Sequence, residues 1–64
     1  MDLNLAPNLA DADGFYDLLI KAHEGLSAAE SEAFNARLIL ILANHIGETK
    51  VLEEALQAAM PRHD

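Results

Sequence analysis

The sequence contains no cysteine, and this absence removes two of the usual means of stabilising a very small protein. Disulfides and thiolate zinc sites are excluded. The 64 residues make at most one domain, near the limit of independent stability. Three histidines (His23, His45 and His63) are too scattered to suggest a metal site. We expect no metal and no cofactor, and oligomerisation is the remaining route to a stable fold.

Basic residues are also scarce. Four lysines and arginines stand against eleven acidic residues, and the net charge is −7. Nucleic acid and anionic membrane surfaces are bound by clusters of basic side chains. Here the basic residues are widely spaced, at Lys21, Arg37, Lys50 and Arg62. We therefore expect neither nucleic acid nor a membrane as a partner.

Long apolar runs are missing as well. The longest, residues 38–43, is far shorter than the roughly 20 residues that span a bilayer. Residues 1–4 lack the basic and apolar regions of a signal peptide. We expect a soluble, cytoplasmic protein that forms one small helical domain over residues 1–64.

The first 12 residues are expected to form an extended arm. Pro7 restricts the residue before it to extended conformations. A first helix is expected at about 13–24, with Asp13 as its N-cap and Gly25 as its left-handed end. The apolar side chains of this helix follow the spacing of one buried face, at Phe15, Leu18, Leu19 and Ala22.

The second helix has the clearest start signal in the chain. Ser27 and Glu30 form a capping box, in which each side chain accepts from the other residue's backbone N–H. The helix is expected to span 28–46 and to end at Gly47. Because the connection before it is short, it should run antiparallel to the first helix.

A third helix is expected at 49–60, because Pro61 cannot easily continue it. Its apolar face consists of Val51, Leu52, Ala55, Leu56, Ala59 and Met60. Residues 62–64 are expected to fray. The sequence thus predicts an all-α fold, a three-helix hairpin or bundle with an N-terminal arm, completed by oligomerisation.

The second helix has too little polar surface for its neighbours to cover. At 100° per residue, Glu30, Arg37 and Asn44 form one narrow polar stripe. Residues 38–43 are apolar almost all round. One flanking helix covers a stripe about 100° wide. The other two helices should therefore cover two stripes and leave a third exposed.

We expect the uncovered surface to be a protein interface, because a contiguous apolar patch usually marks one. The expected interface residues are Tyr16, Ile20, His23, Leu38, Ile39, Leu42 and Ile46. The partner is either a second copy of the chain, which gives a homodimer, or a larger protein. In the alternative arrangement the arm folds back, and Leu3, Leu5 and Leu9 cover the third stripe.

Four polar residues of the second helix are candidates for specificity, at Asn35, Arg37, Asn44 and His45. Asn35 either sets the register of a helical pairing or lies exposed near the first turns. Arg37 either clamps an anionic ligand or a partner carboxylate, or is simply solvated, which is the favoured interpretation. His45 is expected to be structural, because Glu48 alone does not complete a metal site.

No arrangement of residues suggests catalysis. An enzyme needs a nucleophile with a base, or two carboxylates with separated pKa values, inside a pocket. Ser27 is committed to capping, and three short helices offer little volume for a pocket of about 300 Å³. We expect no catalytic residue and no enzymatic activity. Tyr16 and His23 line either a shallow pocket or an interface, and the interface is favoured.

Two blocks of the second helix are distinctive, Asn-Ala-Arg-Leu at 35–38 and Ala-Asn-His-Ile-Gly at 43–47. With them, residues 3–59 resemble a family of short, uncharacterised proteobacterial proteins classed as a domain of unknown function. Members of that family often carry Asp after the glycine, whereas this chain has Glu48, a weaker N-cap. The resemblance implies an accessory subunit of a larger, flavin-dependent enzyme of aromatic catabolism.

Two functions therefore stay open. The first is a protein–protein interaction module, either a homodimer or an accessory or regulatory subunit. The second is a small helical carrier of a hydrophobic or aromatic ligand. In that case the polar contacts to the ligand would come from Tyr16, His23, Arg37, Asn44 and His45.

Overall fold

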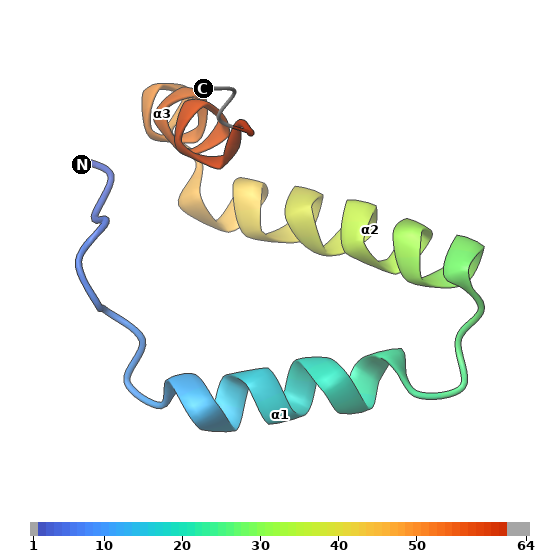
Figure 1. Cartoon of the computed structure of the whole chain (residues 1–64). Coiled ribbons are helices and arrows are strands. Elements are labelled where there is room, and N and C mark those ends of the chain that lie inside the picture. The colour runs from blue at the N-terminus through green and yellow to red at the C-terminus, as the bar shows by residue number, and fades with distance from the viewer. Residues whose placement is uncertain (1, 62–64) are drawn as a thin grey trace.

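The computed structural model describes residues 2–61, which form three helices (Figure 1). α1 spans Ala12–His23, α2 spans Ala28–Ile46 and α3 spans Thr49–Ala59. Residues 2–61 contain no strand. The predicted all-α, three-helix fold is confirmed. The expected fraying at residues 62–64, His63 among them, lies outside the described residues.

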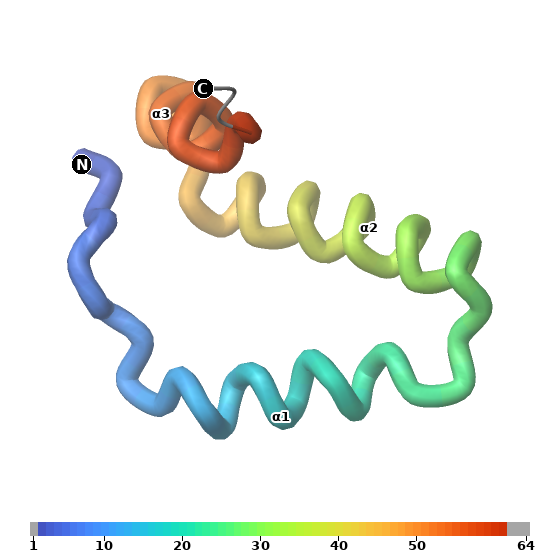
Figure 2. The backbone as a smooth tube through the Cα atoms, viewed as in Figure 1, coloured from blue at the N-terminus to red at the C-terminus, as the bar shows by residue number. Residues whose placement is uncertain are grey.

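The three helices do not pack into a closed bundle (Figure 1). α1 and α2 run in opposite directions, and α3 crosses the far end of α2 (Figure 1). The segment before α1 contains no helix or strand and extends from the start of α1 toward α3. The backbone therefore traces an open ring rather than a closed bundle (Figure 2).

The start of α1 differs from the prediction. Asp11, not Asp13, is the N-cap, and its Oδ1 accepts from the Gly14 backbone N–H at 3.0 Å. Asp13 lies in the first turn, where its charge favours the helix dipole. Both aspartates precede the same apolar pattern. The prediction therefore located the helix correctly but put its N-cap two residues too far along the chain.

The predicted capping box of α2 is confirmed. The Ser27 Oγ accepts from the Glu30 backbone N–H at 3.1 Å, and Glu30 Oε1 accepts from the Ser27 backbone N–H at 2.9 Å. Gly47 ends α2 in the left-handed region, with φ 73°. Gly25, after α1, has φ 79°. Glycine adopts this conformation without the steric cost that a Cβ brings.

The core is very small for a chain of this length. Among the described residues Val51 is the one buried hydrophobic side chain, with 4% of its surface exposed. The chain exposes 5810 Å², whereas a compact protein of this mass exposes about 4,000 Å². Its radius of gyration is 13.8 Å, against about 11 Å for a compact domain of this length. A large apolar surface is therefore left without a partner.

The expected buried faces are only partly covered. On α1, Leu19 is half-buried, but Leu18 of the same predicted face is 67% exposed. On α3, Leu52 is half-buried and Leu56 is 66% exposed. The expectation that α1 and α3 cover two stripes of α2 is wrong. The helices diverge from their connections, so each contacts α2 over only part of its length.

Candidate interaction surface

An apolar groove of about 450 Å³ runs between α2 and α3. We call it the α2/α3 groove, and it is lined by Ile39, Leu42, Ala43 and Ile46 of α2 and by Leu52, Ala55, Leu56 and Ala59 of α3. Every lining residue is aliphatic. Ala43 and Ala55 are half-buried, whereas Ile39 is 62% exposed. The groove is thus deepest at Ala43, Leu52 and Ala55, and its other lining residues are exposed.

The same spacing of apolar residues in α2 and in α3 forms this groove. In each helix the four lining residues fall at i, i+3, i+4 and i+7, the positions that share one side of a helix. Gly47, left-handed between the helices, turns the chain so that the two apolar sides adjoin. The α3 side was predicted only as a core face. The repeated spacing was the available signal that both sides belong to one surface.

The structure separates the predicted interface residues into groups. Ile39, Leu42 and Ile46 line the α2/α3 groove. Tyr16 and Ile20 lie on α1 and are 55% and 65% exposed. The remaining two, His23 and Leu38, are half-buried. The structure therefore does not bring these seven residues into one patch.

His23 makes contacts inside the chain. Its Nδ1 lies 3.0 Å from the Ser31 Oγ, a hydrogen bond whose direction depends on the histidine tautomer. Its ring also meets the ring of Phe34 edge-on, with centroids 4.8 Å apart. These contacts join the end of α1 to the first turns of α2. His23 therefore holds the hairpin together.

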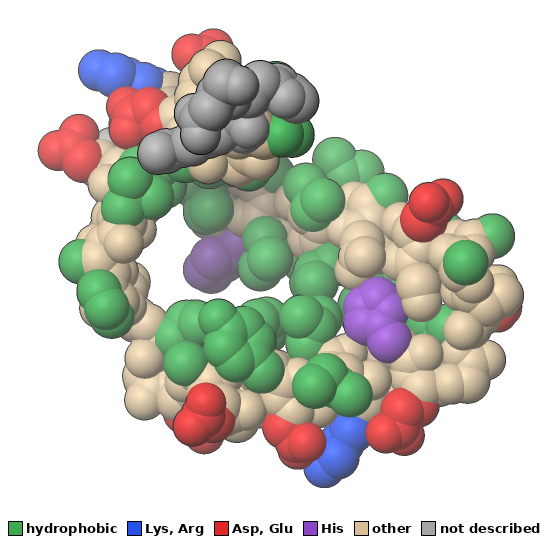
Figure 3. Space-filling model, viewed as in Figure 1, with side chains coloured by type: hydrophobic (Ala, Val, Ile, Leu, Met, Phe, Trp, Pro, Cys, Tyr) green, Lys and Arg blue, Asp and Glu red, His purple; other side chains and the backbone are tan. Residues whose placement is uncertain are grey.

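One side of α1 presents a second apolar surface. We call Phe15, Leu18 and Ala22 the α1 outer face; all three are exposed. Asp17 and Lys21 lie about 110° around the helix from the centre of this face and form an ion pair of 2.8 Å. The space-filling view shows acidic side chains along the outer edge of α1 and hydrophobic ones toward the interior and around the opening beside the N-terminal segment (Figure 3).

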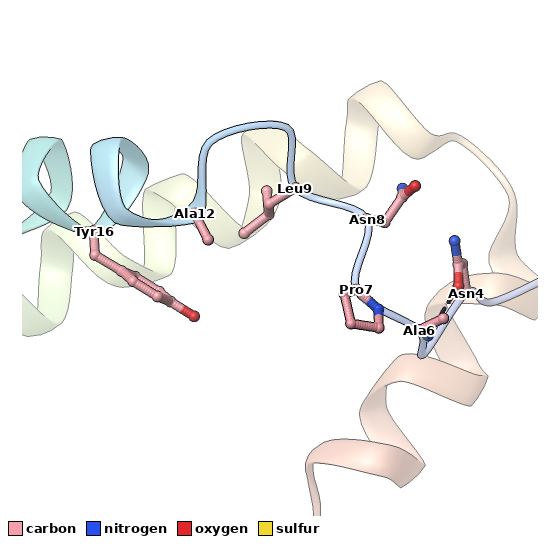
Figure 4. A pocket seen from close by; sticks show the side chains of 7 residues that line it. All are labelled: Asn4, Ala6, Pro7, Asn8, Leu9, Ala12 and Tyr16. Carbon is pink, nitrogen blue, oxygen red and sulfur yellow. Dashed lines mark hydrogen bonds between the residues drawn. The ribbon is translucent and has the colours of Figure 1, made fainter.

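A second hollow, of about 400 Å³, lies beside the start of α1. It is lined by Asn4, Ala6, Pro7, Asn8, Leu9, Ala12 and Tyr16, with the Tyr16 ring extending from the helix toward the segment before it (Figure 4). The Ala6 backbone N–H donates to Asn4 Oδ1 at 2.9 Å. The expectation that three short helices leave little room for a hollow of ligand size is therefore wrong.

The four polar candidates of α2 are exposed: Asn35, Arg37, Asn44 and His45. None of them lines either of the two hollows.

Within residues 2–61 no group of three His, Cys, Asp or Glu side chains is placed to hold a metal ion. Over the same part of the chain, no helix is both long and apolar enough to cross a membrane.

Among the described residues, Glu30 has a carboxyl group whose pKa is clearly lowered. The Ser27 backbone N–H, and secondly the Ser27 hydroxyl, stabilise the charged carboxylate of Glu30 and hold its pKa below the ordinary value. The cause is the capping box, and Glu30 is fully exposed. This shift is therefore a feature of helix initiation and does not indicate an acid or base for catalysis.

Residues 3–61 match the model of a family described as a protein of unknown function, DUF2783. The chain belongs to the DUF2783 family. The match covers all three helices and nearly all the described residues. The resemblance to a domain family of unknown function is thereby confirmed. No curated protein and no solved structure matches this DUF2783 chain.

Proposed function

We propose that this protein is a non-catalytic interaction module, which completes its hydrophobic core only against another polypeptide. One observation carries the proposal: a single hydrophobic side chain, Val51, is buried among residues 2–61, while thirteen large hydrophobic ones are exposed. Each large aliphatic group left in water forfeits about 1.5–3 kcal/mol. A small domain has only about 5–15 kcal/mol of net stability. Covering this surface is therefore the strongest available source of stability.

The α2/α3 groove is the part of this surface best suited to bind a helix. The small side chains of Ala43 and Ala55 allow a close approach of another backbone, and the larger aliphatic side chains of the lining exclude water from the contact. Amphipathic helices commonly bind in such grooves through residues spaced i, i+3, i+4 and i+7. The partner is either a second copy of the chain or a larger protein. The family resemblance implies, for the second case, a flavin-dependent enzyme of aromatic catabolism.

Co-purification from the native host, under native conditions, tests the proposal. We expect a stoichiometric complex with protein, either two copies of the chain or the chain with a different protein. Sedimentation of the purified chain at micromolar concentration is the companion measurement. A stable monomer that neither aggregates nor retains a protein partner would contradict the proposal.

A second candidate function is the binding of a small hydrophobic or aromatic ligand. It is supported by the hollow beside Tyr16, whose volume exceeds the roughly 300 Å³ at which ligand pockets begin. Asn4 and Asn8 add polar groups to the same lining. Mass spectrometry of the native preparation distinguishes the two functions. A bound small molecule without a protein partner would favour this one.

A further inference from the structure

We propose that the α2/α3 groove binds α1 of a second copy, through the α1 outer face, so that two copies form a reciprocal homodimer. This inference rests on the proposed function and names its partner. The groove and the α1 outer face are both apolar, and both are uncovered in the single chain. One is concave and the other is a convex helix surface.

The groove is not filled by α1 of its own chain. His23 fixes the end of α1 to Ser31 and Phe34, on one side of α2. The four α2 residues that line the groove are centred about 100° around the helix from the side of Ser31 and Phe34. No residue before Ile39 lines the groove. Within one chain, α1 and α3 therefore lie on different sides of α2.

The α1 outer face has the features of the helix that this groove would bind. Leu18 is 67% exposed and Phe15 is 39% exposed, although their spacing is that of a buried face. Asp17 and Lys21, paired about 110° around α1 from the centre of this face, can remain in water while the face is covered. An exposed apolar helix face of this kind is the surface that an apolar groove binds, and the same chain provides such a groove.

The area left exposed agrees with a pair of such chains. Each chain exposes about 1,800 Å² more than a compact protein of its mass, or about 3,600 Å² for two chains. Obligate homodimers bury about 2,000–5,000 Å² in total. In a pair related by a two-fold axis, each α1 enters the other chain's groove, so two grooves and two helix faces are covered at once.

The groove can be tested with two variants at neighbouring positions of α2. Ile39 lines the groove and is 62% exposed, and Leu40 is 69% exposed but lies outside it. Ile39→Lys should raise the dimer dissociation constant by roughly 100-fold or more, because a charge would enter an apolar contact. Leu40→Lys should change it less than about threefold. Equal effects in sedimentation equilibrium would overturn the assignment of the groove.

Disulfide cross-linking identifies which helix binds in the groove. Unlike a lysine substitution, it introduces no charge into the apolar contact. The chain has no cysteine, so single-cysteine variants introduce the only thiols. A mixture of Leu18→Cys and Leu56→Cys should form a mixed disulfide dimer on mild oxidation. A mixture of Leu18→Cys and Leu40→Cys should form far less. If both mixtures react alike, α1 does not bind the groove.

The outcomes separate this inference from the proposed function. Two identical chains in sedimentation, with cross-linking only between α1 and the groove, support both. A stoichiometric complex with a different protein, and no dimer of the purified chain, overturns the homodimer but leaves an interaction module. A stable monomer that retains no partner overturns both.

Discussion

Single residues account for where each helix begins and ends. At the start of α2, the side chains of Ser27 and Glu30 each accept a hydrogen bond from the other residue's backbone N–H. At the start of α1, the Asp11 side chain accepts from one backbone N–H, that of Gly14. Left-handed glycines follow α1 and end α2. These are short-range effects that act within four or five residues. They were therefore accessible to prediction, apart from the choice between two neighbouring aspartates at α1.

The capping box should make the stability of α2 depend on acid. The folded-state pKa of Glu30 lies below its ordinary value of 4.5. The carboxylate's contribution is therefore present above that ordinary value, and it is lost as the pH falls through the lowered pKa. Thermal unfolding of the parent chain should lose more stability on acidification than that of Glu30→Gln. Glu32→Gln, outside the box, should follow the parent; superimposable Glu30→Gln and parent profiles would contradict this.

The left-handed end of α2 should resist substitution by any residue with a Cβ. At Gly47 an added Cβ would meet the Asn44 carbonyl oxygen at 3.7 Å, an ordinary contact, so the penalty comes from φ 73° alone. Gly47→Ala should destabilise the fold by about 1–2 kcal/mol. Gly47→Asn should cost less, because asparagine tolerates this conformation better. Urea unfolding compares the two, and equal losses would contradict the backbone explanation.

At the scale of elements, the sequence predicts each helix better than it predicts what the helix packs against. The bounds of α2 agree with the prediction, and those of α1 and α3 differ by one residue at some ends. The apolar spacing of α3 was read correctly, but its role as one wall of a groove was not. Spacing identifies the side of a helix that avoids water. It does not identify which element covers that side, because this depends on the angle at each connection.

α3 is the helix with the weakest start. Its N-cap is Glu48, whose side chain makes no capping hydrogen bond. Aspartate has the shorter side chain that suits this position, and a good N-cap contributes about 0.5–2 kcal/mol. Glu48→Asp should raise the thermal midpoint, whereas Glu48→Gln, equal in length to glutamate, should not. A midpoint that stays the same or falls in Glu48→Asp would show that this cap does not limit the stability of α3.

At the scale of the whole molecule, the sequence predicted that α2 has more apolar surface than its neighbours can cover. The structure has exposed large hydrophobic side chains on all three helices. Tyr16 and Ile20 were grouped with the α2 residues because both sets are apolar. In space the set is divided, because His23 holds only one end of α1 against α2. Such a division depends on tertiary contacts that no local pattern reports. The predictions that concern a partner therefore remain to be tested.

The net charge of the chain gives a test of whether the homodimer contact is apolar. Two copies each carry −7, so long-range repulsion opposes their association. The groove itself is lined by uncharged residues. Salt screens such repulsion over a Debye length of about 10 Å at 0.1 M. Raising the salt concentration from about 0.05 M to about 0.5 M should therefore lower the dissociation constant of the homodimer.

The measurement is sedimentation equilibrium of the purified chain across that salt series. The dissociation constant should fall steadily as salt rises, because the interface is apolar and the charges that repel lie outside it. Double substitution of the adjacent α3 acids, Glu53→Gln with Glu54→Gln, should reduce the salt dependence by lowering the repulsion between copies. An affinity that falls with salt would instead indicate attraction between opposite charges across the contact, and would contradict an uncharged interface between identical chains.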